Sequence, residues 1–118
     1  MRYLLLLHVD EAGWPRLTPD QQREGMAAYA AFGQALSSAG ALVDTGRLSA
    51  SSGGATVRTK GGKAVVMDGP FAETKEQVAG YFIIEAPDMA GALDWAGRCP
   101  AAGHGAVEVR AIADGPQA

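Results

Sequence analysis

A short apolar run near the start of the chain, residues 3–7 (Tyr-Leu-Leu-Leu-Leu), constrains the fold more than any other feature. In a β-strand, successive side chains point to opposite faces, so this run presents apolar side chains on both faces. Residues 81–84 (Tyr-Phe-Ile-Ile) repeat the pattern. A strand that is apolar on both faces needs cover on both. We therefore expect strands over residues 2–9 and 78–86, the first of them central, and cover on both of their faces.

Capping and turn signals mark two helices. The first begins after Thr18, which is a good N-cap, and Gln21 completes a capping box. Gly40 is its natural stop. The second is predicted over residues 89–98, with Asp88 as its cap. The stripe of the first helix that is predicted to face the core consists of Met26, Tyr29, Gly33, Leu36 and Gly40.

Four further segments have the composition of strands. They lie at residues 41–49, 55–60, 63–67 and 106–113. Gly61-Gly62 separates the second and third of these segments, and two glycines between strand-like runs predict a hairpin. The tail from Asp114 is expected to be frayed.

The resulting order, β-α-β-(ββ)-β-α-β, is that of a ferredoxin-like α+β fold with an inserted hairpin. It predicts an antiparallel sheet with two helices on one face, in one domain over residues 1–118. Because the helices cover one face only, the apolar runs leave a patch on the other face of the size that marks an interface. We predict that two such sheets pack face to face in a two-fold homodimer.

The composition argues against several classes of function. The formal net charge of -3 does not favour a surface for nucleic acid or for an anionic membrane. No apolar run approaches the ~20 residues that span a bilayer. Residues 3–7 lead directly into His8 and Asp10, so we expect no signal peptide. A single cysteine, Cys99, favours a reducing cytoplasm, and with only two histidines we expect no zinc site and no cofactor.

Residues 68–76 combine a turn, an aromatic ring and several charges. Asp68-Gly69-Pro70 is turn chemistry, because Gly69 permits a positive φ and Pro70 fixes its own. Phe71 is expected to bury its ring as an anchor. The charged residues of this segment are typical of a loop that lines a cleft.

This segment also carries a resemblance. Residues 66–77 (Val-Met-Asp-Gly-Pro-Phe-Ala-Glu-Thr-Lys-Glu-Gln), followed by Gly80-Tyr81, resemble the signature of the DGPF (DGPFAETKE) family. That family is a branch of the YCII-related proteins in the dimeric α+β barrel superfamily. The likeness extends to residues 1–6, 92–96 and 107–110, and so spans nearly the whole chain. It implies a ferredoxin-like subunit and a dimeric α+β barrel.

The resemblance implies less about activity. Many members of the branch are encoded beside sigma factors of the extracytoplasmic-function type, so a sigma factor is one candidate partner. Some YCII-related relatives look like enzymes that use a His-Asp pair for acid-base elimination, with the histidine on the first helix. This chain has no histidine between Thr18 and Gly40, so that pair is not carried over.

Candidate catalytic residues are His8, Asp68 and Glu73. His8 ends a central strand, and histidine is the usual general base near neutral pH. Crowded carboxylates beside a lysine push pKa values apart, as in an acid-base pair. The structural alternatives are that His8 bonds to backbone, that Asp68 caps the turn, and that Glu73 and Lys75 pair with Arg47 or with a partner subunit.

Two functions of different class follow. The first is a homodimeric module that binds a small ligand or a protein partner, and the alternative is a small cofactor-free lyase or isomerase with its cleft between sheet and helices. The residues predicted to contact a ligand or an interface are Arg47, Phe71, Lys75, Glu76 and Tyr81. Cys99 is expected to be a buried thiol, and His104 is left without an assigned role.

Overall fold

A computed structural model describes residues 1–114, and the predicted frayed tail falls almost wholly outside them. Its order confirms the ferredoxin-like α+β fold, with a short third helix added. The elements are β1 (Arg2–Val9), η1 (Trp14–Arg16), α1 (Pro19–Ser38), β2 (Leu42–Arg47), η2 (Ser51–Gly53), β3 (Ala55–Lys60), β4 (Lys63–Asp68), β5 (Gln77–Glu85), α2 (Met89–Arg98), α3 (Ala101–His104) and β6 (Ala106–Ala111).

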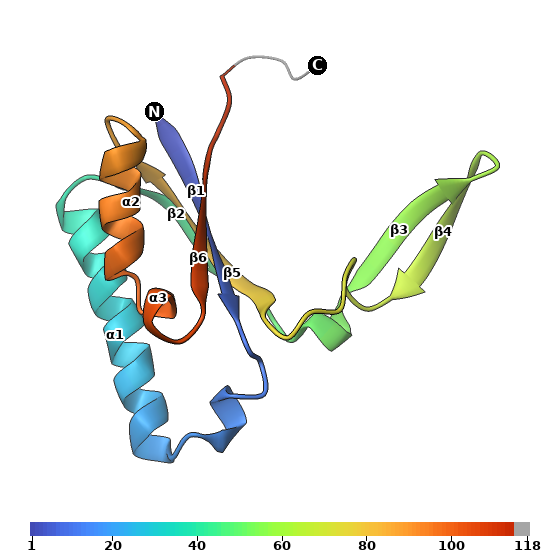
Figure 1. Cartoon of the computed structure of the whole chain (residues 1–118), viewed down its shortest axis with the longest axis horizontal. Coiled ribbons are helices and arrows are strands. Elements are labelled where there is room, and N and C mark those ends of the chain that lie inside the picture. Colours follow the sequence, from blue (N-terminus) through green and yellow to red (C-terminus); the bar gives the residue numbers. More distant parts are fainter. Residues whose placement is uncertain (115–118) are drawn as a thin grey trace.

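The main sheet has the order β2-β5-β1-β6, and all its neighbouring strands are antiparallel. The two runs that are apolar on both faces lie in the central strands, β1 as predicted and β5 beside it. Figure 1 shows α1 and α2 on the same side of this sheet. The opposite side, which we call the open face, carries no helix among the described residues.

One irregularity interrupts the β1–β5 ladder. Leu7 pairs with Gly80, but His8 pairs with Val78, so Ala79 is an extra residue on β5. Such a β-bulge lets the side chains on either side of it keep their faces while the strand bends. The bulge lies where β5 enters the sheet from the preceding loop.

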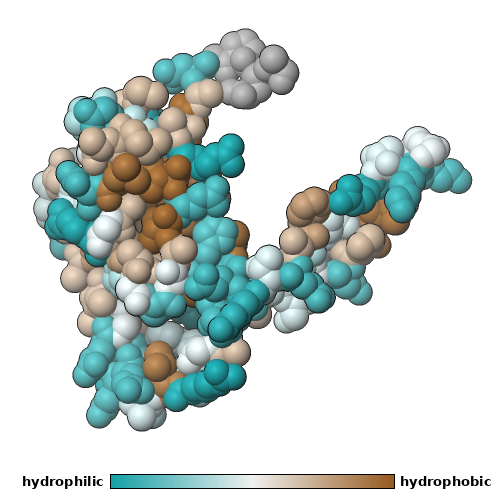
Figure 2. Space-filling model, viewed as in Figure 1, coloured by the Kyte–Doolittle hydropathy of each residue, from teal (hydrophilic) through white to brown (hydrophobic). Residues whose placement is uncertain are grey.

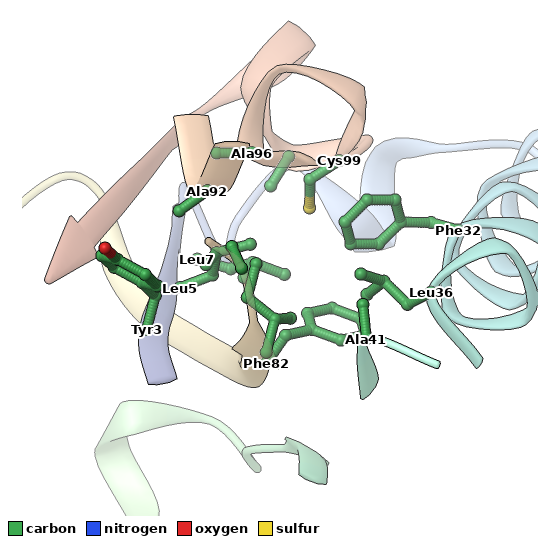
Figure 3. Packing of buried hydrophobic residues seen from close by; sticks show 13 residues of the cluster. Tyr3, Leu5, Leu7, Phe32, Leu36, Ala41, Phe82, Ala92, Ala96 and Cys99 are labelled. Carbon is green, nitrogen blue, oxygen red and sulfur yellow. The ribbon is translucent and has the colours of Figure 1, made fainter. Parts of the chain in front are cut away.

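The hydrophobic core fills the space between the sheet and the helices (Figure 3). Leu5, Leu36 and Ile84 are fully buried, and the Phe32 ring meets Phe82 edge to face at 5.0 Å. The core position predicted for Met26 is wrong, because that side chain is 56% exposed. The buried face of α1 is centred on Phe32 and Leu36, and Met26 lies about 80° round the helix from Leu36 at 100° per residue.

The helix ends confirm the capping signals. Thr18 Oγ1 accepts a hydrogen bond from the Gln21 amide, and Gln21 Oε1 accepts one from the Thr18 amide. Asp88 Oδ1 accepts from the Gly91 amide at the start of α2. Gly40 follows α1 with a φ of 70°, the left-handed conformation that ends many helices. None of the helices in residues 1–114 is both long enough and apolar enough to cross a bilayer.

β3 and β4 form a separate two-stranded sheet that we call the arm (residues 55–68). Gly61 and Gly62 both have positive φ, which confirms the predicted hairpin turn. The arm projects away from the rest of the chain (Figure 1). As a result the radius of gyration is 16.3 Å, against about 13.5 Å for a compact chain of this length.

Candidate functional site

The open face has an apolar floor between two polar margins. Strand alternation places Leu4 and Leu6 of β1 and Ile83 of β5 on this face, because their neighbours Leu5, Leu7 and Phe82 are buried under the helices. Leu4 pairs directly with Ile83, and all three floor residues are half-buried in the single chain. The edge strands β6 and β2 supply the polar margins.

His8 and Glu108 form the polar pair on the β6 side. His8 Nε2 lies 3.0 Å from Glu108 Oε1, and the two side chains are 26% and 44% exposed. Arg110 Nη1 lies 3.7 Å from the other oxygen of Glu108. The carboxylate therefore holds the imidazole in one orientation, while solvent still reaches both groups.

Tyr81 and Asp44 form the pair on the β2 side. The Tyr81 hydroxyl donates a hydrogen bond of 3.1 Å to Asp44 Oδ2, and this bond raises the pKa of Tyr81. The ring lies across Gly46, its direct cross-strand neighbour, where an added Cβ would come within 2.7 Å of the ring. A glycine at position 46 thus leaves the space that the Tyr81 ring occupies.

The loop between β4 and β5 lines two adjoining hollows of about 610 and 620 Å³. Thr74 and Lys75 line both hollows together with Asp10, and His104 lines the first. Glu11 fixes the opposite wall, because its carboxylate accepts hydrogen bonds of 2.8 Å from the amide and the hydroxyl of Ser51. Residues of the 68–76 segment therefore line open hollows of mixed polar and apolar character.

The anchor position predicted for Phe71 is wrong. Its side chain is 76% exposed, and the ring packs against the Arg58 guanidinium of the arm at 5.0 Å. Gly69 has a φ of 95°, so the turn itself forms as expected. Its geometry sends Phe71 toward the arm and away from the core of the main sheet.

The structure separates the predicted catalytic residues. His8 contacts Glu108 on the open face, while Asp68 and Glu73 line the second hollow, which His8 does not line. The cleft that the enzyme hypothesis placed between sheet and helices is wrong, because core side chains fill that space. Within residues 1–114, no ion pair involves the other charged residues that the sequence predicts for a site or an interface. These are Arg47, Asp68, Glu73, Lys75 and Glu76.

A second cluster of titratable groups lies on the helix side. Cys99 is buried as expected, and its burial raises the pKa of the thiol. Burial, with Cys99 as a second cause, raises the pKa of Tyr29 to about 12. The Tyr29 hydroxyl lies 3.5 Å from His104 Nε2, and the two rings meet edge to face. Within residues 1–114, no group of three or more His, Cys, Asp or Glu side chains could hold a metal ion.

Sequence reasoning missed Glu108 and Asp44 as members of a site. A signal for Glu108 was present, since β1 and β6 are neighbours in a ferredoxin-like sheet and alternation places Glu108 and Arg110 on one face. Asp44 carries no comparable signal. Its position beside Tyr81 depends on a shift in the β2–β5 register between Leu42 and Asp44.

The sheet order and the one-sided helix layer define a ferredoxin-like α+β fold with one open sheet face in residues 1–114. The model of the YCII-related domain matches residues 1–115, and the chain belongs to the YCII-related family. An uncharacterised protein of Rhizobium meliloti (strain 1021) is 35% identical over 96 residues, which cover 81% of this chain and 77% of that relative.

Proposed function

We propose that this protein is a homodimeric small-ligand-binding protein of the DGPF branch, and that its ligand site is the open face. The branch is supported by residues 68–76, which read Asp-Gly-Pro-Phe-Ala-Glu-Thr-Lys-Glu. A sigma factor as protein partner and a cytoplasmic location stay predictions of the resemblance and the composition.

One observation carries the ligand site: an apolar floor lies between two polar pairs that are already oriented. Small-molecule sites combine a mostly apolar lining with a few well-placed polar groups. Here the floor is Leu4, Leu6 and Ile83, and the polar pairs are His8–Glu108 and Asp44–Tyr81. Because each pair holds its side chains in place, a ligand loses little free energy in ordering them.

The dimer is supported by the same face. Two central strands present half-buried apolar side chains on a face that no helix covers in residues 1–114. A second copy related by a two-fold axis would cover the face with an identical one, because such an interface uses the same patch on both subunits. The polar margins would then lie at the rim of an enclosed space.

A thermal-shift screen of metabolite-like compounds tests the ligand site. We expect at least one compound to raise the melting temperature of the wild type and to lose most of that effect on His8→Ala. His104→Ala is the matched control, because His104 contacts Tyr29 on the helix side and lies off the open face. The proposal fails if no compound stabilises the wild type, or if both variants respond alike.

A second candidate function is acid-base catalysis by a lyase or isomerase. The observation that favours it is the 3.0 Å contact between His8 Nε2 and Glu108 Oε1 in a solvent-accessible position. A carboxylate that accepts the Nε2 proton leaves Nδ1 free to remove a proton from a ligand. Any compound found in the screen should then be converted by the wild type, as followed by NMR. At a compound concentration that saturates both proteins, Glu108→Gln should convert it at least tenfold more slowly, and equal conversion by the variant would exclude this role.

A further inference from the structure

The arm exposes apolar side chains that the rest of the protomer does not cover. Within residues 1–114, β3 and β4 pair with each other and with no other strand. Val57 and Val66 stand directly opposite one another on one face of the arm, and they are 61% and 64% exposed. A two-stranded hairpin is at best marginally stable in water when nothing packs against it. The arm therefore needs a surface to pack against.

The other face of the arm is also partly apolar. Alternation places Met67, which is 54% exposed, on this face together with Val65 and Arg58. The 76% exposed ring of Phe71 lies over the Arg58 guanidinium and extends this face toward the main sheet. Figure 2 shows hydrophobic atoms exposed along the arm, and an open space between the arm and the body.

The root of the arm is fixed to the protomer. The Gly69 amide donates a hydrogen bond of 2.8 Å to the Gly54 carbonyl, and the Thr56 hydroxyl donates one of 3.0 Å to the Gly69 carbonyl. These bonds close the two chains at the base of the hairpin. The arm extends from this base on the side of the sheet away from α1 and α2, which is the side of the open face (Figure 1). Any molecule that covers the open face must approach from the side on which the arm extends.

The charges of the arm differ from those of the body. Residues 55–68 hold three of the ten basic residues, Arg58, Lys60 and Lys63, but only one of the thirteen acidic residues, Asp68. The arm is therefore positive and the remainder of the chain is distinctly negative. A positive arm is complementary to the negative body of another copy, which favours encounter between the two.

We propose that the arm clasps a second copy of this chain, so that the partner's arm closes the rim of the open face. This inference rests on the proposed homodimer and adds the element that holds it together. Two-fold symmetry would pack each arm against the body of the other copy. The Val57–Val66 pair of both arms would then be covered. Nucleic acid is the less favoured occupant of a basic hairpin, because the body that carries it would repel phosphates.

The test measures self-association by sedimentation equilibrium. Val57→Asp/Val66→Asp places two charges on the arm, at side chains that are 61% and 64% exposed. Met26→Asp/Leu93→Asp is the matched control, because these apolar side chains are similarly exposed, at 56% and 53%, on the helices. We expect the arm variant to dimerise at least tenfold more weakly than the wild type, and the helix variant to match the wild type.

Two further measurements test whether the aspartate variant weakens the dimer only because its hairpin unfolds. Val57→Thr/Val66→Thr keeps β-branched side chains, and so keeps the strands, while removing apolar surface. We expect it to weaken the dimer by a smaller factor than the aspartate pair. In the wild type, hydrogen exchange of amides 55–68 should slow as protein concentration rises through the dissociation constant.

The outcomes separate this inference from the proposed function. Equal dissociation constants for the arm variants and the wild type would overturn the clasp and leave the dimer standing. A wild type that stays monomeric at every concentration would overturn both the dimer and the clasp. An arm variant that dimerises normally but loses affinity for a random-sequence DNA duplex would overturn the clasp in favour of a nucleic-acid contact.

Discussion

His8 and Glu108 meet diagonally across β1 and β6, with Nε2 and Oε1 3.0 Å apart. The direct partner of His8 is Ala106, and that of Glu108 is Leu6. The small side chain of Ala106 leaves room for the imidazole to lean toward Glu108, and diagonal neighbours are within reach of long side chains. The pair therefore stands beside Leu6, at the margin of the apolar floor.

Glu108→Gln should separate binding from stability. An exposed ion pair contributes at most about 1 kcal/mol, so the unfolding free energy without ligand should change by less than that. The thermal shift produced by a ligand of the open face should fall, because the neutral amide of glutamine holds the imidazole less strongly than the carboxylate does. Glu85→Gln is the control, since Glu85 pairs with Arg2 and the N-terminus at the far end of β1. Equal shifts in both variants would contradict the role given to Glu108.

Gly105→Ala should destabilise the protein by about 1–3 kcal/mol. A Cβ at position 105 would overlap the main-chain oxygen of His8, and neither backbone can move without disturbing the β1–β6 ladder. At Gly103, in contrast, an added Cβ meets nothing within 4 Å. Urea unfolding of the two variants should therefore show a loss for Gly105→Ala and none for Gly103→Ala. Similar unfolding curves would contradict the close approach.

Phe32→Ala and Phe71→Ala should differ sharply. Phe32 is 5% exposed and Phe71 is 76% exposed. Removing the buried ring should destabilise the protein by about 3–5 kcal/mol. Phe71→Ala should lower the stability of the dilute protomer by less than about 1 kcal/mol, because the ring contacts chiefly Arg58. A loss for Phe71→Ala that grows with protein concentration would report its burial by a second copy.

The contrast between these rings shows where sequence patterns suffice. The N-cap of α1 at Thr18 and the Gly61-Gly62 turn were predictable, because a cap or a two-residue turn depends on neighbours in sequence. The position of the Phe71 ring was not predictable. The residues around it form no periodic pattern that would show which surface the ring packs against. The fate of its ring depends on the direction in which the arm leaves the sheet, and that direction is a tertiary property.

The same limit applies to the candidate site. The place of His8 at the end of an apolar strand predicts it as a site residue. The sequence predicts its partner among the charged residues 68–76, because these lie close together in sequence and near a turn. The actual partner, Glu108, is separated from His8 by 100 residues and becomes its neighbour through the sheet order alone. The buried face of α1 is also turned relative to the predicted stripe, because Phe32 lies in that face and Met26 does not.

Stability should fall between about pH 10 and pH 12 because of Tyr29. Burial raises the pKa of Tyr29 from 10.0 to about 12, so the folded state keeps a proton that the unfolded state releases. The contribution of Tyr29 to the free energy of unfolding is complete below about pH 10, and it is lost as the pH rises through the pKa of the folded state. Because the ring is partly exposed, this contribution to stability is about 1–2 kcal/mol. Tyr29→Phe should flatten urea-derived stability over this range, and an unchanged slope would contradict the assignment.

The bulge at Ala79 sets the direction in which the preceding loop and the arm leave the main sheet. Deleting that one residue would leave Leu7 opposite Gly80 and His8 opposite Val78, so Gln77 and Val78 would keep their faces. The strand would lose the local bend and extra twist of the bulge, and the loop and arm would leave the sheet in a different direction. The core under α1 and α2, which uses Phe82 and Ile84 beyond the bulge, would stay as it is. Loss of a single codon could therefore re-aim the arm without refolding the body. Relatives that differ by one residue here would be expected to assemble differently.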